Sequence, residues 1–168
     1  MLKKKRLTLY FITLMLFCQP TVGVSAISGA QKKAIVDNCS AIKESLKNTQ
    51  RADVRARVYF GGRFETVLTQ FITPLNVKLV EKNITNLGLI GNQSNFVAAK
   101  TSFADDFVKY QQALEELIGI DCKSEPVGFY EKLVATRERR ARMVQDIARV
   151  KRLISENIKL VTGLKEGL

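Results

Sequence analysis

Residues 94–119, SNFVAAKTSFADDFVKYQQALEELIG, carry the clearest helical pattern in the sequence. Apolar residues recur in this stretch every three or four positions, which is the period of one face of an α-helix. They are Phe96, Ala99, Phe103, Phe107, Tyr110, Leu114 and Leu117. Ser94 or Asn95 is a suitable N-cap, and Gly119 is a typical helix end. The stretch therefore predicts a helix over residues 94–118.

A second apolar stripe precedes this stretch and predicts a long first helix over about residues 29–82. Its members are Ile35, Cys39, Ile42, Leu46, Val54, Val58, Phe64, Leu68, Phe71, Leu75 and Leu79. Glycine lowers helix propensity by about 1 kcal/mol per residue, and proline removes a backbone donor. We therefore expect a kink or weak point at Gly61-Gly62 or at Pro74. Alternatively, Thr73 is an N-cap and Pro74 begins a separate short helix.

The remaining segments complete an all-α fold, an elongated antiparallel three-helix bundle or coiled coil. Residues 83–94 (NITNLGLIGNQS) are rich in Asn and Gly and predict a loop. After a connector at residues 120–125, Pro126 is suited to a helix start and predicts a last helix over residues 126–162. Its apolar stripe consists of Phe129, Leu133, Val144, Ile147, Ile154, Ile158 and Val161. Because the connector is short, the second and third helices should be antiparallel neighbours.

The N-terminus has the features of a secretory signal peptide over residues 1–26, which leaves residues 27–168 as a single helical domain. The basic start LKKKR precedes an apolar run, and Val24 and Ala26 are small residues typical of a cleavage site. The run is about 12 residues long, whereas a membrane-spanning helix needs roughly 20, so an uncleaved anchor is the weaker interpretation. We expect a secreted or periplasmic protein of the cell envelope, without a stable membrane span after cleavage.

Charge indicates the type of partner. The chain has 27 Lys and Arg against 16 Asp and Glu, a formal net charge of +11. The leader holds four of the basic residues, so the mature chain has 23 basic and 16 acidic residues and a net charge of +7. A chain with this excess favours anionic partners.

Two cysteines remain after cleavage, Cys39 and Cys122. In an exported protein such a pair favours one disulfide, and two free thiols or an intermolecular bond are the alternatives. The disulfide would hold the first and second helices antiparallel at one end of the molecule. In the chain-entropy model, closing a loop of this length stabilises the fold by about 4 kcal/mol.

Arg140 is the one charge that falls inside the apolar stripe of the last helix. A charge in such a position needs a partner. The antiparallel arrangement places Arg140 opposite about residue 104, where Asp106 lies at the edge of the facing stripe. We therefore predict a buried ion pair between Arg140 and Asp106 that fixes the register of the two helices.

The last helix also carries a broad basic face away from its apolar stripe. It consists of Arg137, Arg142, Arg149, Arg152 and Lys159. This face is suited to an anionic lipid or cell-wall polymer, and the alternative is a simply solvated helix surface. Nucleic acid is the weaker candidate, because neither aromatic stacking residues nor a nest of donors accompanies the charges.

The segment at residues 59–64, YFGGRF, gathers aromatic residues around two glycines. Tyr59 and Phe60 could form an interaction patch, since aromatic residues anchor interfaces. In the alternative structural interpretation, the segment packs within the protein and Gly61-Gly62 lies close to Ala98 and Ala99 of the second helix. The small residues would then allow two backbones to approach closely.

The absence of histidine excludes His-dependent catalytic triads, proton shuttles and zinc sites. The sequence has no phosphate-binding loop, dinucleotide fingerprint or clustered metal ligands, so we predict no enzymatic activity and no cofactor. The favoured function is a structural or interaction protein of the cell envelope that binds a protein or an anionic component. The alternative is a periplasmic holdase, because the chain is similar in composition to the Skp-type chaperones, although it lacks the small β-body through which they trimerise. Either function is compatible with an oligomer.

Overall fold

The computed structural model describes residues 27–166, so the predicted signal peptide lies outside the described residues. Within this range every element is helical, which confirms the all-α fold. The elements are α2 (Gly29–Asp37), α3 (Cys39–Val67), the π-helical turn η1 (Leu68–Ile72), α4 (Thr73–Glu81), α5 (Leu87–Gly119) and α6 (Pro126–Glu166). No helix in the described range is both long enough and apolar enough to cross a bilayer.

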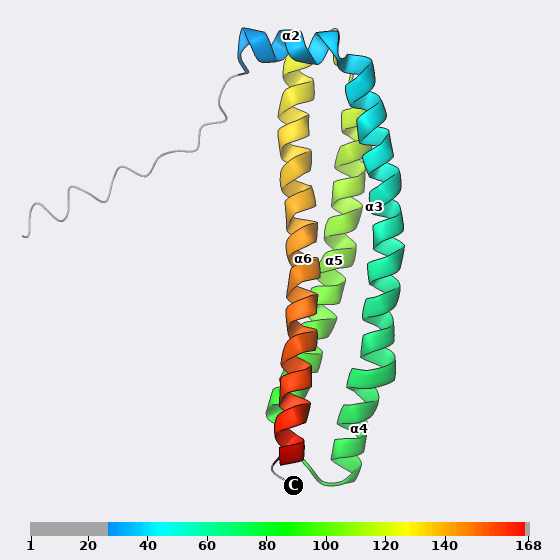
Figure 1. Cartoon of the computed structure of the whole chain (residues 1–168), viewed down its shortest axis with the longest axis vertical. Coiled ribbons are helices and arrows are strands. Elements are labelled where there is room, and N and C mark those ends of the chain that lie inside the picture. The colour runs from blue at the N-terminus through cyan, green and yellow to red at the C-terminus, as the bar shows by residue number, and fades with distance from the viewer. Residues whose placement is uncertain (1–26, 167–168) are drawn as a thin grey trace, which may run out of the picture.

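Three long legs run side by side, and a short helix lies across one end of them (Figure 1). The first leg is the continuous run of α3, η1 and α4, the second is α5 and the third is α6. α5 packs along α6 and also against α3, whereas α3 and α6 contact each other little. We call the end with α2 and residues 120–125 the disulfide end. The end with α4, residues 82–86 and the last turns of α6 is the open end.

The predicted first helix is broken at Asn38, so its assignment as one segment from residue 29 is wrong. A capping box starts α2: the Gln31 backbone N–H donates to Ser28 Oγ, and the Ser28 N–H donates to Gln31 Oε1. At the other end of α2, the Asn38 side chain donates to the Ala34 carbonyl. Because the chain turns there, α2 lies over the ends of the legs and buries Ile35.

The glycine pair leaves α3 unbroken, so the kink expected at Gly61-Gly62 is absent from this helix. The close packing predicted against Ala98 and Ala99 is also wrong, since a Cβ placed on either glycine would meet no atom within 4 Å. The reason lies one turn further on, where the Phe64 ring packs edge-on against the rings of two phenylalanines of α5. These bulky side chains keep the two backbones apart at this level.

A π-helical turn lies at the other expected weak point, directly before Pro74. A proline ring in a regular helix clashes with the carbonyl four residues earlier, and a widened turn relieves that clash. Thr73 is not the N-cap that the alternative reading proposed, because the chain passes from Val67 to Thr73 in helical conformation. The first leg therefore continues through the proline rather than starting a new helix there.

The connection between the first and second legs is shorter than predicted. Asn83 has a positive φ of 57° and ends α4 in a Schellman arrangement, in which the Ile84 N–H donates to the Leu79 carbonyl. Asn86 then caps α5 by accepting from the Leu89 backbone N–H. The loop assigned to residues 83–94 is thus mostly helix. Burial of Leu89 outweighs the low helix propensity of the two glycines in this stretch.

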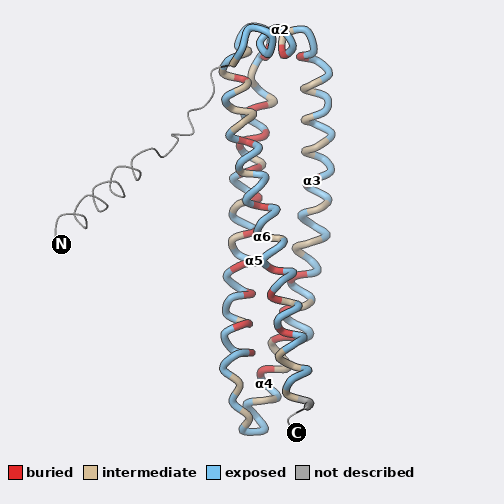
Figure 2. The backbone as a smooth tube through the Cα atoms, turned by 60° about the vertical axis from the view of Figure 1, so that its left-hand side comes forward, coloured by how far each residue is buried: buried red, intermediate tan, exposed pale blue. Residues whose placement is uncertain are grey.

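The core lies between the three legs and includes a row of aromatic rings between α3 and α5. Figure 2 shows the buried positions along the inner sides of the legs. Five of the buried positions of α6 recur every seven residues, and two of these are polar. The five are Phe129, Thr136, Met143, Val150 and Asn157, and Leu153 is buried beside them. The predicted stripe of α6 is therefore wrong in part, because Val144 and Ile158 are exposed.

Candidate functional site

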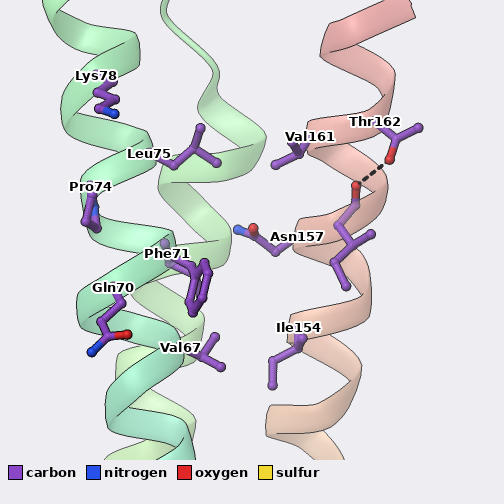
Figure 3. A pocket seen from close by; sticks show the side chains of 12 residues that line it. Val67, Gln70, Phe71, Pro74, Leu75, Lys78, Ile154, Asn157, Val161 and Thr162 are labelled. Carbon is purple, nitrogen blue, oxygen red and sulfur yellow. Dashed lines mark hydrogen bonds between the residues drawn. The ribbon is translucent and has the colours of Figure 1, made fainter.

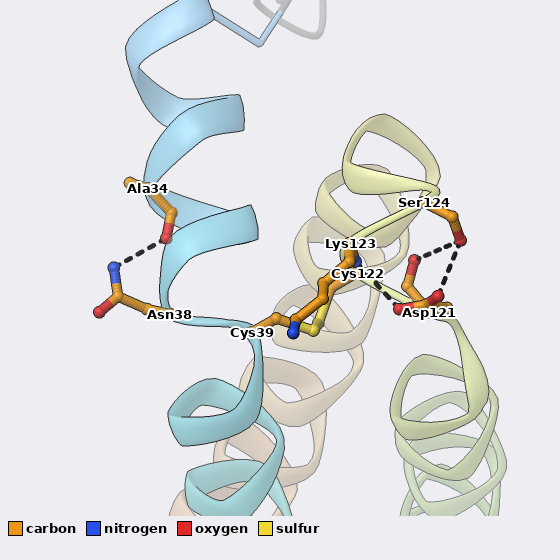
Figure 4. Close-up of a disulfide and its surroundings, with 7 residues drawn as sticks. All are labelled: Ala34, Asn38, Cys39, Asp121, Cys122, Lys123 and Ser124. Atoms are coloured by element: carbon orange, nitrogen blue, oxygen red, sulfur yellow. Dashed lines mark hydrogen bonds between the residues drawn. A yellow bond between two sulfur atoms is a disulfide. The ribbon is translucent and has the colours of Figure 1, made fainter.

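The sulfur atoms of Cys39 and Cys122 lie at disulfide-bonding distance, with the Cα atoms 5.7 Å apart, which confirms the predicted pairing (Figure 4). Both side chains are buried. Next to the bond, the carboxylate of Asp121 accepts hydrogen bonds from the Lys123 N–H and the Ser124 hydroxyl. These bonds, the one from the backbone of Lys123 foremost, lower the pKa of Asp121. The disulfide end is thus held by a covalent bond and an ordered connector.

Arg140 pairs with Asp53 of α3, so the predicted ion pair with Asp106 is wrong. The guanidinium donates to both carboxylate oxygens of Asp53, at 2.9 and 3.0 Å. The carboxylate is buried, with 6% of Asp53 exposed, whereas the Arg140 side chain is 46% exposed. The pair therefore joins the first and third legs and is only partly shielded from water.

Tyr110 of α5 completes this site. Its hydroxyl donates to Asp53 at 2.7 Å, so one carboxylate holds all three legs together. Burial disfavours the charge on Asp53, but the hydrogen bonds from Arg140 and Tyr110 outweigh burial and hold its pKa below 3.8. Burial and the hydrogen bond to Asp53 raise the pKa of Tyr110. The sequence contains no local signal for this partnership, because Asp53 is 87 residues away from Arg140.

The register of α5 against α6 explains the wrong partner. Equal spacing from the connector would place Thr136 opposite about residue 108, but its hydroxyl donates to the carbonyl of Ala113. This shift of five residues is more than one helical turn and places Arg140 opposite about residue 109 instead of about residue 104. Arg140 bonds to Asp53 rather than to the carboxylate of Asp106. That carboxylate instead approaches Lys109 on its own helix, at 3.7 Å, and Asp146 on α6. Burial first, and then the charge of Asp106, raise the pKa of Asp146.

The basic face of α6 is exposed along its length. Its members are Arg137, Arg142, Arg149, Arg152 and Lys159. Within residues 27–164 none of them forms a salt bridge. The face is thus accessible to an anionic partner, and its function stays a prediction.

The predicted aromatic patch is divided between two environments. Tyr59 is 54% exposed and lies beneath the guanidinium of Arg63, 4.8 Å from the ring centroid. Phe60 is half buried and has the ammonium group of Lys151 from α6 over its ring, at 5.2 Å. Phe60 therefore helps to hold the first leg against the third, and only Tyr59 is available to a partner.

The π-helical turn changes which side chains of the first leg face inward. Phe64 and Leu68 are buried as the stripe predicts, whereas the stripe is wrong at Val54 and Val58, which are exposed. After Leu68 the buried positions are Ile72 and Asn76 rather than Phe71 and Leu75. A π-turn holds one residue more than an α-turn, so the inward-facing position moves by one. Phe71 consequently leaves the core and is 63% exposed.

The displaced side chains line an apolar groove at the open end, between the first leg and α6 (Figure 3). Its volume is about 550 Å³. Phe71 and Leu75 point into it from one wall, and Ile154 and Val161 from the other. The complete lining is Val67, Gln70, Phe71, Ile72, Pro74, Leu75, Lys78, Ile154, Asn157, Ile158, Val161 and Thr162. We call this surface the open-end groove.

Buried amides hold both walls of the groove to α5. On the first leg, Asn76 donates to the Leu89 carbonyl and to Gln93, both on α5. On the third leg, Asn157 donates to Asn92 of α5, and Asn92 donates in turn to the Leu153 carbonyl. Since each wall is tied to α5 rather than to the other wall, the space between them stays open.

The chemistry of the open-end groove is that of a binding surface. Among the residues whose side chains the structure describes, Lys78 is the one charged residue that lines it. The described residues contain no cluster of three or more side chains able to hold a metal ion. The sequence pattern missed this surface because it placed Phe71 and Ile158 in the core. One signal for the groove was present in the sequence of α6. Its predicted apolar stripe lies beside the positions that are buried, so the apolar face of the helix is wider than contact with α5 alone requires.

No protein-family model, curated protein or solved structure matches this chain.

Proposed function

We propose that this protein is an exported, non-enzymatic interaction protein of the cell envelope. It is an elongated three-helix bundle that is stapled at one end and binds a protein partner at the other. The observation that carries this proposal is the open-end groove, where Phe71 and Ile158 are 63% and 61% exposed. Large apolar side chains that gather at the surface mark interaction sites, because leaving them in water costs free energy.

The basic face of α6 supports an envelope location for the complex. Its five exposed cations attract anionic lipid or cell-wall polymer, while the groove binds the partner. The two surfaces have different chemistry, so one molecule could use both together. Retention of the mature protein on anionic vesicles should weaken steeply with salt, and Arg149→Ala/Arg152→Ala should elute earlier than the wild type.

Site-specific crosslinking tests the proposal. A photo-crosslinking residue replaces Phe71 in the mature protein, which is then incubated with envelope extract and irradiated. The matched control carries the same residue at Val127, which is partly exposed at the disulfide end. We expect one protein adduct from position 71 and none from position 127, identified by mass spectrometry. Equal labelling at both positions would contradict a specific site.

Export and chaperone activity need separate measurements. N-terminal sequencing of the protein from the cell envelope should find Ile27 as its first residue. If the purified protein instead suppresses aggregation of an unfolded outer-membrane protein without a defined adduct at position 71, the holdase function replaces the proposed one.

A further inference from the structure

We propose that the occupant of the open-end groove is an amphipathic helix with an acidic flank, supplied by the partner protein. This inference rests on the proposed function and gives the partner a chemistry. The groove becomes the position of a fourth helix beside the three legs.

The walls of the groove have the spacing that accepts a helix. Residues 67, 71, 75 and 78 line one wall, and residues 154, 158 and 161 line the other. The lining residues of each wall are three or four positions apart, which is the spacing of a ridge on a helix surface. The side chains of an occupying helix can pack between the two ridges. Residues 154–161 extend over about 10 Å of helix, which corresponds to roughly two turns of an occupant.

Charge selects an acidic flank for that helix. Lys78 lies at the groove, and none of the described residues that line it is acidic. Towards the disulfide end, the same boundary between the first leg and α6 carries Lys151, an exposed cation whose ammonium group lies over Phe60. A carboxylate one or two turns from the apolar anchor of the occupant would meet Lys78, and a further acid would approach Lys151.

The same charges disfavour a second copy of this chain. The mature protein carries a net charge of +7. Pairing two grooves would bring together two surfaces that each carry Lys78 and Lys151. Like charges at an interface oppose association. An acidic helix is attracted where a second copy is repelled.

The openness of the groove disfavours a small amphiphile. A typical small-molecule site encloses about 70–90% of its ligand. Here Phe71 and Ile158 are themselves mostly exposed, so an acyl chain would stay in contact with water on one side. An amphipathic helix requires only one covered face, because its other face is polar.

A pair of designed peptides tests the inference on the mature protein with its disulfide intact. Each peptide has about 18 residues, enough for a helix to form, and the same Leu and Phe face. One carries Glu on both flanks and the other carries Lys. Fluorescence anisotropy should show that the acidic peptide binds at least about tenfold more tightly, and that salt reduces the difference.

Variants place the binding in the groove. Phe71→Ala and Ile158→Ala should each weaken the acidic peptide about tenfold or more, since exposed aromatic and aliphatic anchors dominate such contacts. Lys78→Glu should favour the basic peptide over the acidic one. Val80→Ala is the matched control, because Val80 is an exposed apolar residue of α4 outside the groove lining and should leave affinity unchanged.

Three results would overturn the inference. The first is equal affinity for the two peptides, or affinity that Phe71→Ala does not change. The second is a Phe71-dependent dimer in sedimentation velocity, which would assign the groove to a second copy. The third is Phe71-dependent binding of laurate that displaces the peptide. Crosslinking from position 71 is independent of all three, so a protein adduct without acidic preference would leave the proposed function standing.

Discussion

The two ends of the rod are held by different means. At the disulfide end, Cys39 and Cys122 join the first leg to the connector between the other two, and α2 covers the ends of the helices. At the open end, hydrogen bonds of buried Asn76, Asn92 and Asn157 tie two legs separately to α5. The first arrangement closes the core, whereas the second leaves apolar walls in water.

The difference shows how a small helical protein can keep an apolar surface exposed. Packing α4 directly against α6 would bury Phe71 and Ile158, so the open groove forgoes stabilisation. A disulfide that closes a long loop offsets part of that loss. The buried amides need their hydrogen bonds to α5 and therefore keep the walls in place. The expected effects below run from the largest to the smallest.

Removing the disulfide should have the largest effect. Cys39→Ala/Cys122→Ala should lower the free energy of unfolding by about 4 kcal/mol, because the unfolded chain regains the freedom that the closed loop removes. Urea unfolding measures this loss. Reducing agent should destabilise the wild type by a similar amount and leave the double variant unchanged. A loss below about 1 kcal/mol would mean that the disulfide end is held by packing alone.

Phe64 and Phe71 test whether the π-helical turn changes which side chains of the first leg face the core. Phe64 is 2% exposed, and Phe64→Ala should cost about 3 kcal/mol by leaving a cavity. Phe71→Ala should cost no more than about 0.5 kcal/mol, because this side chain is mostly in water. Thermal or urea unfolding of both variants measures the contrast. Similar losses would show that Phe71 is a core residue in solution.

The ion pair in the middle of the rod should contribute less. Arg140→Ala should cost about 2 kcal/mol at neutral pH, since it removes two hydrogen bonds from a buried carboxylate whose partner is itself half exposed. The folded-state pKa of Asp53 is below 3.8, so its contribution is complete above that pH and is lost as pH falls through the folded value. Asp53→Asn should remove this pH dependence, and a double-mutant cycle with Asp106 should show no coupling to Arg140.

Asp146 should show the smallest effect and the opposite sign. Its pKa is raised above 3.8 in the folded state, so its contribution is full below that pH and is lost as pH rises through the folded value. Asp146→Asn should therefore stabilise the protein at neutral pH, by less than about 1 kcal/mol because the group is only partly buried. Asp106→Asn should act in the same direction. Unfolding curves at several pH values would reveal a destabilised variant if this account is wrong.

Local patterns anticipated most of the helices and the cysteine pair. The apolar period of residues 94–118 was enough to predict the largest part of α5. The presence of two cysteines in the predicted mature chain was enough to predict the disulfide. The partner of Arg140 was not predictable, because Asp53 lies on another helix, 87 residues away, and α6 is shifted along α5 by about five residues from the predicted register. The open-end groove was missed for a similar reason, since a single extra residue in the π-turn exposes Phe71.

The sequence by itself determined that this protein is helical, basic and able to form one internal disulfide. These properties depend on residue type and on spacings of a few positions. The tertiary structure alone decided which apolar residues stay in the core and which line the groove, and which acid meets Arg140. Those outcomes depend on the rotation and sliding of whole helices, and a change of one residue in a turn is enough to redirect every side chain that follows.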